Sequence, residues 1–311
     1  MMKKYYPQIL AGALALTVTA TTSAQTVTGV FIGKGTSYVQ TDATTVIVNP
    51  EPVSPTHGGA YGFEATVEGS GLSAPTVTLA AGSGIPTSDP TSHNGGVLGF
   101  NTDDMSWQYG SSNFNNWGAT TAGEIDTLFA NGNYTVSIPT FSPVTLNLTT
   151  PGVALNAPLL TLSSTSGFWS GGIYYVNPNE TIFITSNAFT AFGSNTNGHI
   201  GFYGWDADTG ASILTGAQEV DRLFTDDSTD TITSSITAGT LISGETYTIE
   251  ADFAAVVDMD TSTLPGGAAA VAFWSYGTQI TIQAVPEPST YAVIAGALCL
   301  GIAMLRRRKL S

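Results

Sequence analysis

Two acidic residues before a glycine are the first candidates for chemistry in this chain. Asp206 and Asp208 stand two positions apart, and Gly210 follows them. Alternating oxygen ligands before a glycine turn are typical of the first half of a calcium loop. The twelfth position of such a loop would carry a bidentate glutamate, but here it is Ala217. We therefore keep calcium at Asp206 and Asp208 as a candidate beside a solvated acidic turn, and expect no other cofactor.

The residue types that support catalysis form no known motif. His57, His93 and His199 are far apart in the sequence and lack the spacing of metal ligands. The Gly-Ser-Gly turns at residues 69–71 and 82–84 lack the strand-to-helix context of a hydrolase nucleophile. Carboxylates are frequent enough for pairs to arise by chance, and no clustered glutamates of the glycosidase type occur. We expect no enzymatic activity, and the enzyme alternative is a glycan-active hydrolase.

Aromatic residues form the remaining candidate site. They gather in two stretches, with Trp107, Tyr109, Phe114 and Trp117 in the first and Phe168, Trp169, Tyr174, Tyr175 and Trp205 in the second. Sandwich lectins stack sugars on exposed aromatic rings beside Asn and Asp, and Asn residues lie within the first stretch. Packing in a hydrophobic core explains the same side chains. Glycan binding is therefore kept as an alternative function.

The elements that position these residues are predicted to be β-strands. Apolar Tyr247, Ile249 and Phe253 alternate with polar residues, as in a strand with one buried face. Similar runs occupy residues 44–48, 61–67, 134–138, 181–185 and 278–282. Glycine, proline and asparagine separate the runs, so the pattern predicts an all-β fold. Helical spacing occurs only in residues 122–130 and 217–224.

An internal repeat predicts two similar units. Residues 72–79 align without gaps on residues 155–162, and residues 127–136 resemble residues 240–249. Chance similarity in threonine-rich sequence is the alternative. We place the break between the units near residues 149–152.

In both units a leucine stands six residues before a tyrosine, as Leu128 and Tyr134 and as Leu241 and Tyr247. This spacing resembles the tyrosine corner of fibronectin type III and immunoglobulin-like sandwiches. The resemblance implies a tyrosine hydroxyl bonded back to the backbone. It also implies two tandem antiparallel β-sandwich domains, at residues 25–150 and 151–284. Without paired cysteines, an immunoglobulin domain with an inter-sheet disulfide is excluded.

The first 24 residues have the pattern of a secretory signal peptide. Lys3 and Lys4 precede an apolar stretch at residues 9–18, and small residues end at Ala24. The apolar stretch is too short to span a membrane stably. We expect export through the Sec translocon and cleavage after Ala24.

The last 27 residues, 285–311, carry three features in a fixed order. Pro286, Glu287 and Pro288 begin an extended linker, an uncharged apolar run covers residues 291–305, and residues 306–309 are basic. A helix of the apolar run is about 22 Å long, shorter than the roughly 30 Å hydrocarbon core, so the membrane or the flanking residues must adapt. The positive-inside rule keeps the basic residues in the cytoplasm.

This order closely resembles the PEP-CTERM sorting signal of bacterial surface proteins. The resemblance implies a transmembrane helix at residues 291–305 that holds the chain transiently in the inner membrane. It also implies that an exosortase cuts the chain near Pro286, Glu287 and Pro288. The alternative is a C-terminal membrane anchor without processing.

The body between these two segments is strongly acidic. Residues 25–283 hold 22 of the 23 acidic residues but only two basic residues, Lys34 and Arg222, which gives a formal charge of −20. Such a surface argues against nucleic acid or anionic lipid as a partner, and solubility alone explains it. The single cysteine, Cys299, lies in the C-terminal apolar run. The body therefore depends on buried apolar surface rather than on a disulfide.

Together these features predict an exported protein of a Gram-negative bacterium, located at the outer cell surface or in the extracellular matrix. The PEP-CTERM resemblance implies a host that makes exopolysaccharide. We therefore expect a structural or adhesive role in that matrix, with extracellular polysaccharide as a partner. A glycan-binding module is the alternative in the binding class.

Overall fold

The computed structural model describes residues 25–50, 59–84, 96–101, 105–109, 117–152, 154–190, 198–214, 220–223 and 231–285. Strands dominate this part of the chain, which confirms the predicted all-β class. All six predicted strand runs lie in or overlap an observed strand. The predicted signal peptide and the segment from Pro286 onward lie outside the described residues.

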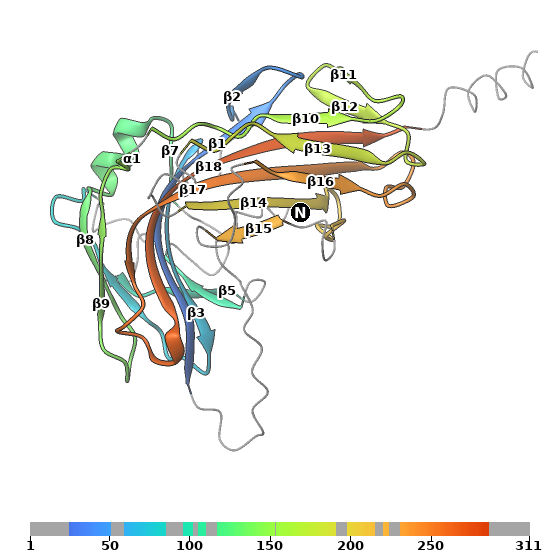
Figure 1. Ribbon diagram of the computed structural model, residues 1–311. Helices are drawn as coiled ribbons and strands as arrows, with labels where there is room; N and C mark the ends of the chain where they lie inside the picture. Colours follow the sequence, from blue (N-terminus) through green and yellow to red (C-terminus); the bar gives the residue numbers. More distant parts are fainter. Residues whose placement is uncertain are drawn as a thin grey trace, which may run out of the picture.

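The strands and helices follow one another along the chain as shown in Figure 1. The first half contains β1 (Thr26–Gln40), β2 (Val46–Val48), β3 (Tyr61–Ser70), β4 (Thr76–Thr78), β5 (Gly99–Asn101), β6 (Ser106–Gln108), β7 (Trp117–Ala119), α1 (Ala122–Leu128), β8 (Gly132–Ser137) and β9 (Val144–Leu148). The second half contains β10 (Leu160–Ser163), β11 (Phe168–Ser170), β12 (Ile173–Val176), β13 (Ile182–Ser186), β14 (Gly198–Asp206), β15 (Val220–Leu223), β16 (Thr233–Ile236), β17 (Thr246–Asp260), η3 (Pro265–Gly267) and β18 (Ala269–Ala284).

One large sheet runs through the whole molecule. Its main strand order is β15-β14-β17-β18-β1-β3-β6-β5. The antiparallel strands β17 and β18 have 15 and 16 residues, so each extends about 50 Å at 3.3 Å per residue. Figure 1 shows them bending in the middle and connecting the two ends of the molecule. On its other edge β18 pairs in parallel with β1, from Gly29↔Ala269 to Val39↔Gln279, and then with β12.

Two three-stranded sheets, β4-β8-β9 and β10-β13-β16, contribute side chains to two hydrophobic cores that they share with the large sheet. In β18, Ala270 and Ala272 belong to the first core, and Ile280 and Ile282 to the second. Alternate residues of a strand point to the same face, so both cores lie on one face of the large sheet. The predicted boundary after residue 150 stays a prediction. It falls between β9 and β10, although β17 and β18 contribute to both cores.

Both predicted corner tyrosines are buried and bond to the backbone. The Tyr134 hydroxyl donates to the Ala130 carbonyl at 2.7 Å, and the Tyr247 hydroxyl accepts from the Ile242 N–H at 2.7 Å. The predicted hydroxyl-to-backbone contact is therefore confirmed in each unit. The two corners are not equivalent, however, because β8 is the middle strand of a small sheet whereas β17 lies in the large sheet. The predicted match of residues 127–136 with residues 240–249 is thus wrong in one respect, because the two segments occupy different positions in the sheets.

The first half of the repeat is better supported. Val77 in β4 and Leu160 in β10, which the alignment matches, are both buried and both lie in edge strands of the small sheets. They belong to different cores, Val77 to the first and Leu160 to the second. The aligned residues 72–79 and 155–162 therefore each include an edge strand of a small sheet, one in each half of the molecule.

Of the two predicted helical stretches, only the first is helical. In α1, the Thr121 side chain accepts from the Glu124 N–H at 3.1 Å, and the Glu124 carboxylate accepts from the Thr120 N–H at 2.8 Å. The first contact caps a free N–H group of the first turn, and the second binds Glu124 to the residue before the cap. The prediction at residues 217–224 is wrong, because Val220–Leu223 form β15 by pairing with β14. Within the described part of the chain, no helix has the length and apolar character to cross a membrane.

Candidate functional site

The predicted calcium residues form a closed turn at the end of β14. The Asp206 Oδ1 atom accepts hydrogen bonds from the Thr209 N–H at 2.7 Å, the Thr209 hydroxyl at 2.8 Å and the Asp208 N–H at 3.1 Å. These bonds, led by that from the Thr209 N–H, lower the pKa of Asp206. One carboxylate oxygen of Asp206 is thus occupied by its own loop, which is the ordinary behaviour of an aspartate-initiated turn.

Two more turns of this kind occur among the described residues. Asp42 accepts from the N–H groups of Thr44 and Thr45, and Asp260 accepts from the N–H groups of Ser262 and Thr263. The pKa of Asp42 is lowered chiefly by the hydrogen bond from the Thr44 N–H, and the pKa of Asp260 chiefly by the hydrogen bond from the Thr263 hydroxyl. Across the residues that the structure describes, no three His, Cys, Asp or Glu side chains form a group that could hold a metal ion. Calcium binding at Asp206 and Asp208 stays a prediction.

The predicted aromatic stretches separate into buried and exposed members. Tyr109 packs edge-on against Phe63 and Phe129 in the first core, and Trp205 is also buried. Phe114 and the side chain of Trp117 lie outside the described part. In the second stretch the Trp169 ring packs edge-on against the buried Tyr174.

Phe168 is exposed and stacks on Tyr175 across the β11–β12 hairpin, with the ring centroids 5.3 Å apart. Among the described members of the two stretches, Phe168 is exposed, whereas Trp107, Trp169 and Tyr175 are half-buried.

A second aromatic surface was not predicted. Tyr61, Thr36 and Tyr276 are neighbours across β3, β1 and β18, and Tyr38 lies two positions after Thr36. The rings of Tyr38 and Tyr276 meet edge to face at 5.4 Å. All three tyrosines are half-buried, and burial is the main cause that raises the pKa of Tyr38 to about 12. We call Tyr38, Tyr61 and Tyr276 the tyrosine surface.

The tyrosine surface lies between the two hydrophobic cores, on the same face of the large sheet. In the pairing of β1 with β18, Thr36 lies opposite Tyr276 and Tyr38 lies opposite Thr278. The sequence of β1 or of β18, taken alone, contains too few aromatic residues to indicate such a surface. Only the parallel pairing of β1 with β18 brings their rings together, and no local sequence pattern indicates that pairing.

A buried acidic cluster lies on the opposite face of the large sheet. Glu250 is 4% exposed, and Asp252 and His199 are 0% exposed. The Gln279 side chain donates to Glu250 at 2.9 Å, and the His199 Nδ1 atom lies 3.8 Å from the Asp252 Oδ2 atom. Gly277 leaves room for the two carboxylates, because a Cβ there would lie 3.0 Å from Glu250 Oε1. In the described part of the structure, neither Asp252 carboxylate oxygen has a hydrogen-bond partner.

The acidic cluster corrects the sequence-based view of β17. The alternation predicted that Glu250 and Asp252 face solvent, but β17 lies in the interior of the large sheet, and both carboxylates are buried. Burial raises the pKa of Glu250 to about 8, and it also raises the pKa of Asp252. At neutral pH Glu250 therefore keeps its proton. The cluster is a buried polar network without the solvent access that a hydrolytic carboxylate pair requires.

The two targeting sites, Ala24 and the Pro286, Glu287 and Pro288 segment, lie outside the described residues. The structure does describe the residue next to the second site. The Val285 N–H donates to the Val176 carbonyl at 2.8 Å, one residue after the end of β18. Among the described residues, this hydrogen bond is the one directly before Pro286.

No family model and no curated protein sequence matches this chain. Its function is therefore inferred from its own residues and geometry.

Proposed function

We propose that this chain is an exported protein of the bacterial cell surface or extracellular matrix, with a structural or adhesive role. Its C-terminal segment would be sorted by an exosortase. The observation that carries the proposal is the order of Pro286, Glu287 and Pro288, then the apolar residues 291–305, then the basic residues 306–309. A signal-peptide pattern at the other end of the chain supports the same destination.

The end of the body supports this proposal. The sheet ends at Ala284, and Val285 still bonds to the body. Proline has no N–H for a further sheet hydrogen bond, so Pro286 and Pro288 are suited to leaving the sheet. A protease could cut there without breaking a described hydrogen bond of the body.

For the body we propose two units of the immunoglobulin or fibronectin type III kind, joined through one large sheet. The hydrogen-bonded tyrosines Tyr134 and Tyr247 support this assignment. Each of the two cores also draws its side chains from a small sheet and the large sheet. Elongated bodies of this kind are suited to spacing or adhesion at a surface.

Glycan binding is a second candidate function. The half-buried tyrosine surface, and the exposed Phe168 stacked on Tyr175, favour it. Aromatic rings present flat apolar faces with polar edges, which suit the C–H face and hydroxyl groups of a sugar. Extracellular polysaccharide is the ligand class that fits the proposed location.

The sorting proposal is tested by expressing the full chain in a bacterium with an active exosortase and measuring the mass of the recovered protein. We expect a C-terminus near residues 286–288 and location outside the inner membrane. A variant with Pro286→Ala, Glu287→Ala and Pro288→Ala should retain residues 306–309 and stay in the membrane fraction. If the unaltered chain also retains residues 306–309, it is a membrane-anchored protein and the sorting proposal is wrong.

A further inference from the structure

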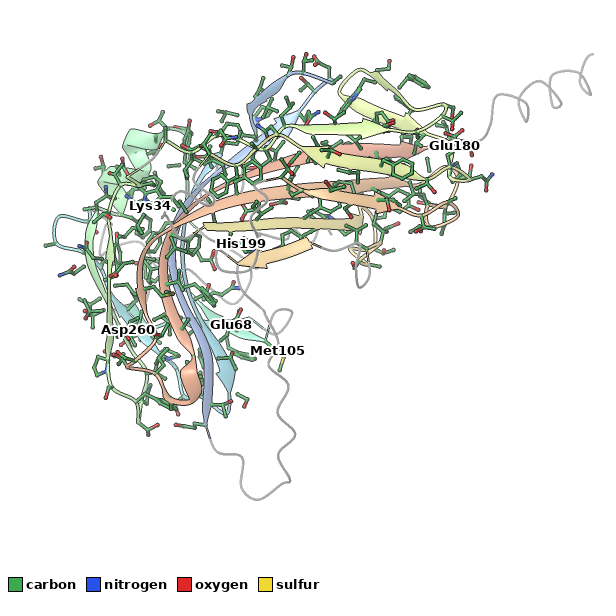
Figure 2. The ribbon with its side chains drawn as sticks, in the orientation of Figure 1. Lys34, Glu68, Met105, Glu180, His199 and Asp260 are labelled. Carbon is green, nitrogen blue, oxygen red and sulfur yellow. The ribbon has the colours of Figure 1, made fainter. Side chains whose placement is uncertain are left out.

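Lys34 is the only lysine between residues 5 and 308, and it is buried. Its side chain is 1% exposed, and it projects from the middle of β1 at the bend of the large sheet (Figure 2). Burial is the main cause that lowers the pKa of Lys34. A desolvated lysine of this kind gains nucleophilic character, because more of it is present as the neutral amine.

Two side chains of the first unit receive the Lys34 amine. The Nζ atom lies 2.7 Å from Asp126 Oδ1 of α1 and 2.9 Å from Asn131 Oδ1. Asn131 lies in the turn directly before β8. The ring of Trp274 covers the amine on another side, with its centroid 5.1 Å from Nζ. Amine, amide and carboxylate therefore meet within hydrogen-bonding distance beside an aromatic ring.

The two polar atoms of the Asn131 side chain face different partners. Its oxygen faces Lys34, while its Nδ2 atom donates to the Thr150 hydroxyl at 3.1 Å. The Lys34 amine and the Asn131 carboxamide are therefore in direct contact, and the nitrogen that would leave hydrogen-bonds to a different residue. Holding two reacting groups in such a geometry can replace a large part of the barrier to their reaction.

We propose that Lys34 and Asn131 become joined by an intramolecular amide bond. The neutral Lys34 Nζ attacks Asn131 Cγ and forms the new C–N bond. The Asp126 carboxylate takes a proton from Nζ and delivers it to Nδ2, the bond between Cγ and Nδ2 breaks, and ammonia leaves. Counted from the protonated lysine, the products are the amide and one ammonium ion, and no oxidant or cofactor is consumed.

The surroundings of the three groups fit this reaction. The Asp126 side chain is 49% exposed, which gives ammonia and the proton a route to water. The bond would connect β1 of the large sheet to the turn before β8 of the small sheet. It would supply a covalent link to a body whose residues 25–285 contain no cysteine.

The experiment is peptide mapping of the full chain after secretion and denaturation. Digestion at acidic residues should yield a branched peptide that joins Lys34 to Asn131. Its mass should be lower than the sum of the two linear peptides by one ammonia, about 17 Da. Lys34 should also resist an amine-reactive label in the denatured chain. Recovery of Lys34 in a linear, fully labelled peptide would overturn the proposal.

A second ammonia loss must be separated from this one. Asn131 precedes Gly132, and such a pair can cyclise to a succinimide, which loses the same mass. A succinimide leaves Lys34 free to react with the label, so this outcome also contradicts the proposed bond.

Variants test the role of each group. Asn131→Asp should form the same link with loss of water, about 18 Da, and Lys34→Arg should form none. Asp126→Ala should reduce the linked fraction at least tenfold, and an undiminished fraction would exclude Asp126 as the proton carrier. The matched control is Asn133→Ala in the exposed part of β8, which should leave the link complete. Because the main measurement uses the unaltered chain, the test does not depend on the folding of any variant.

Discussion

The side-chain amide of Gln40 closes a pair of hydrogen bonds with the backbone of Leu160. The Gln40 Nε2 atom donates to the Leu160 carbonyl at 2.7 Å, and the Leu160 N–H donates to Gln40 Oε1 at 2.8 Å. Gln40 is 1% exposed and ends β1, whereas Leu160 begins β10 and belongs to the second core. The Gln40 side chain, from the first half of the chain, thus satisfies the backbone N–H and carbonyl of Leu160 at the start of β10.

We predict that Gln40→Ala destabilises the whole body. The substitution leaves a buried N–H and a buried carbonyl without their partner, which costs about 2–4 kcal/mol in the free energy of unfolding. Chemical denaturation with fluorescence detection measures the change. Thr145→Ala removes an exposed hydrogen bond to Thr135 and should cost less than about 1 kcal/mol. Equal effects of the two substitutions would contradict a special role for Gln40.

Removing the corner hydroxyls should destabilise the body by a smaller amount. Tyr134→Phe and Tyr247→Phe each delete one hydrogen bond to the backbone and leave the buried ring in place. We expect a loss of about 1–2 kcal/mol for each, measured by thermal or chemical unfolding. Tyr175→Phe, in a partly exposed ring, is the control and should be nearly neutral. If the control matches the corner variants, the hydroxyl-to-backbone bonds contribute nothing particular.

The acidic cluster predicts a pH dependence with a definite sign. Burial raises the pKa of Glu250 to about 8 in the folded chain, from its ordinary value of 4.5. The folded state thus holds the proton more tightly, and the stabilisation is full below about pH 4.5 and falls as the pH rises toward 8. We expect wild-type melting temperature to fall between pH 5 and pH 8, and Glu250→Gln to reduce that fall.

The comparison needs a control, because the acidic body also gains charge repulsion as the pH rises. Asp208→Asn removes an exposed carboxylate and should keep the wild-type slope. An unchanged slope in Glu250→Gln would show that Glu250 is already ionised in the folded chain.

Polysaccharide binding, if present, should depend on the tyrosine surface. Tyr276→Ala removes the ring that contacts Tyr38, and we expect binding to exopolysaccharide to weaken at least fivefold, corresponding to about 1 kcal/mol. Affinity electrophoresis in gels that contain the polysaccharide measures this change. Tyr175→Ala tests the other aromatic surface in the same gel. If neither variant migrates differently from wild type, the aromatic surfaces do not bind that polymer.

Local patterns predicted many of the strands but not how those strands assemble. Alternation of apolar residues identified the segment around Tyr247, and the leucine-to-tyrosine spacing identified both hydroxyl contacts. Alternation could not show that Glu250 is buried, because a polar face looks the same in sequence whether it meets water or protein. Residues Val220–Leu223 have helical spacing, but pairing with β14 outweighed that preference.

The candidate sites were predictable to a smaller extent. The Asp206 turn is closed by its own hydrogen bonds, and calcium binding there stays a prediction. Lys34 and Asn131 lie 97 residues apart in the sequence, yet their side chains are in contact. Hydrophobic periodicity and short-range motif spacing cannot predict a contact between residues so far apart in the sequence.

The parallel pairing of β1 with β18 has a consequence for when the body can fold. A chain is synthesised from its N-terminus, yet Gly29 finds its neighbour only at Ala269, about 240 residues later. The backbone groups of β1 that pair with β18 therefore cannot form these hydrogen bonds until nearly the whole chain has been made. If the chain is exported as proposed, β18 is also the last strand to cross before the C-terminal apolar run enters the membrane. The final step of folding and the arrival of the sorting segment would then coincide, so that a completed sheet accompanies each chain presented for processing.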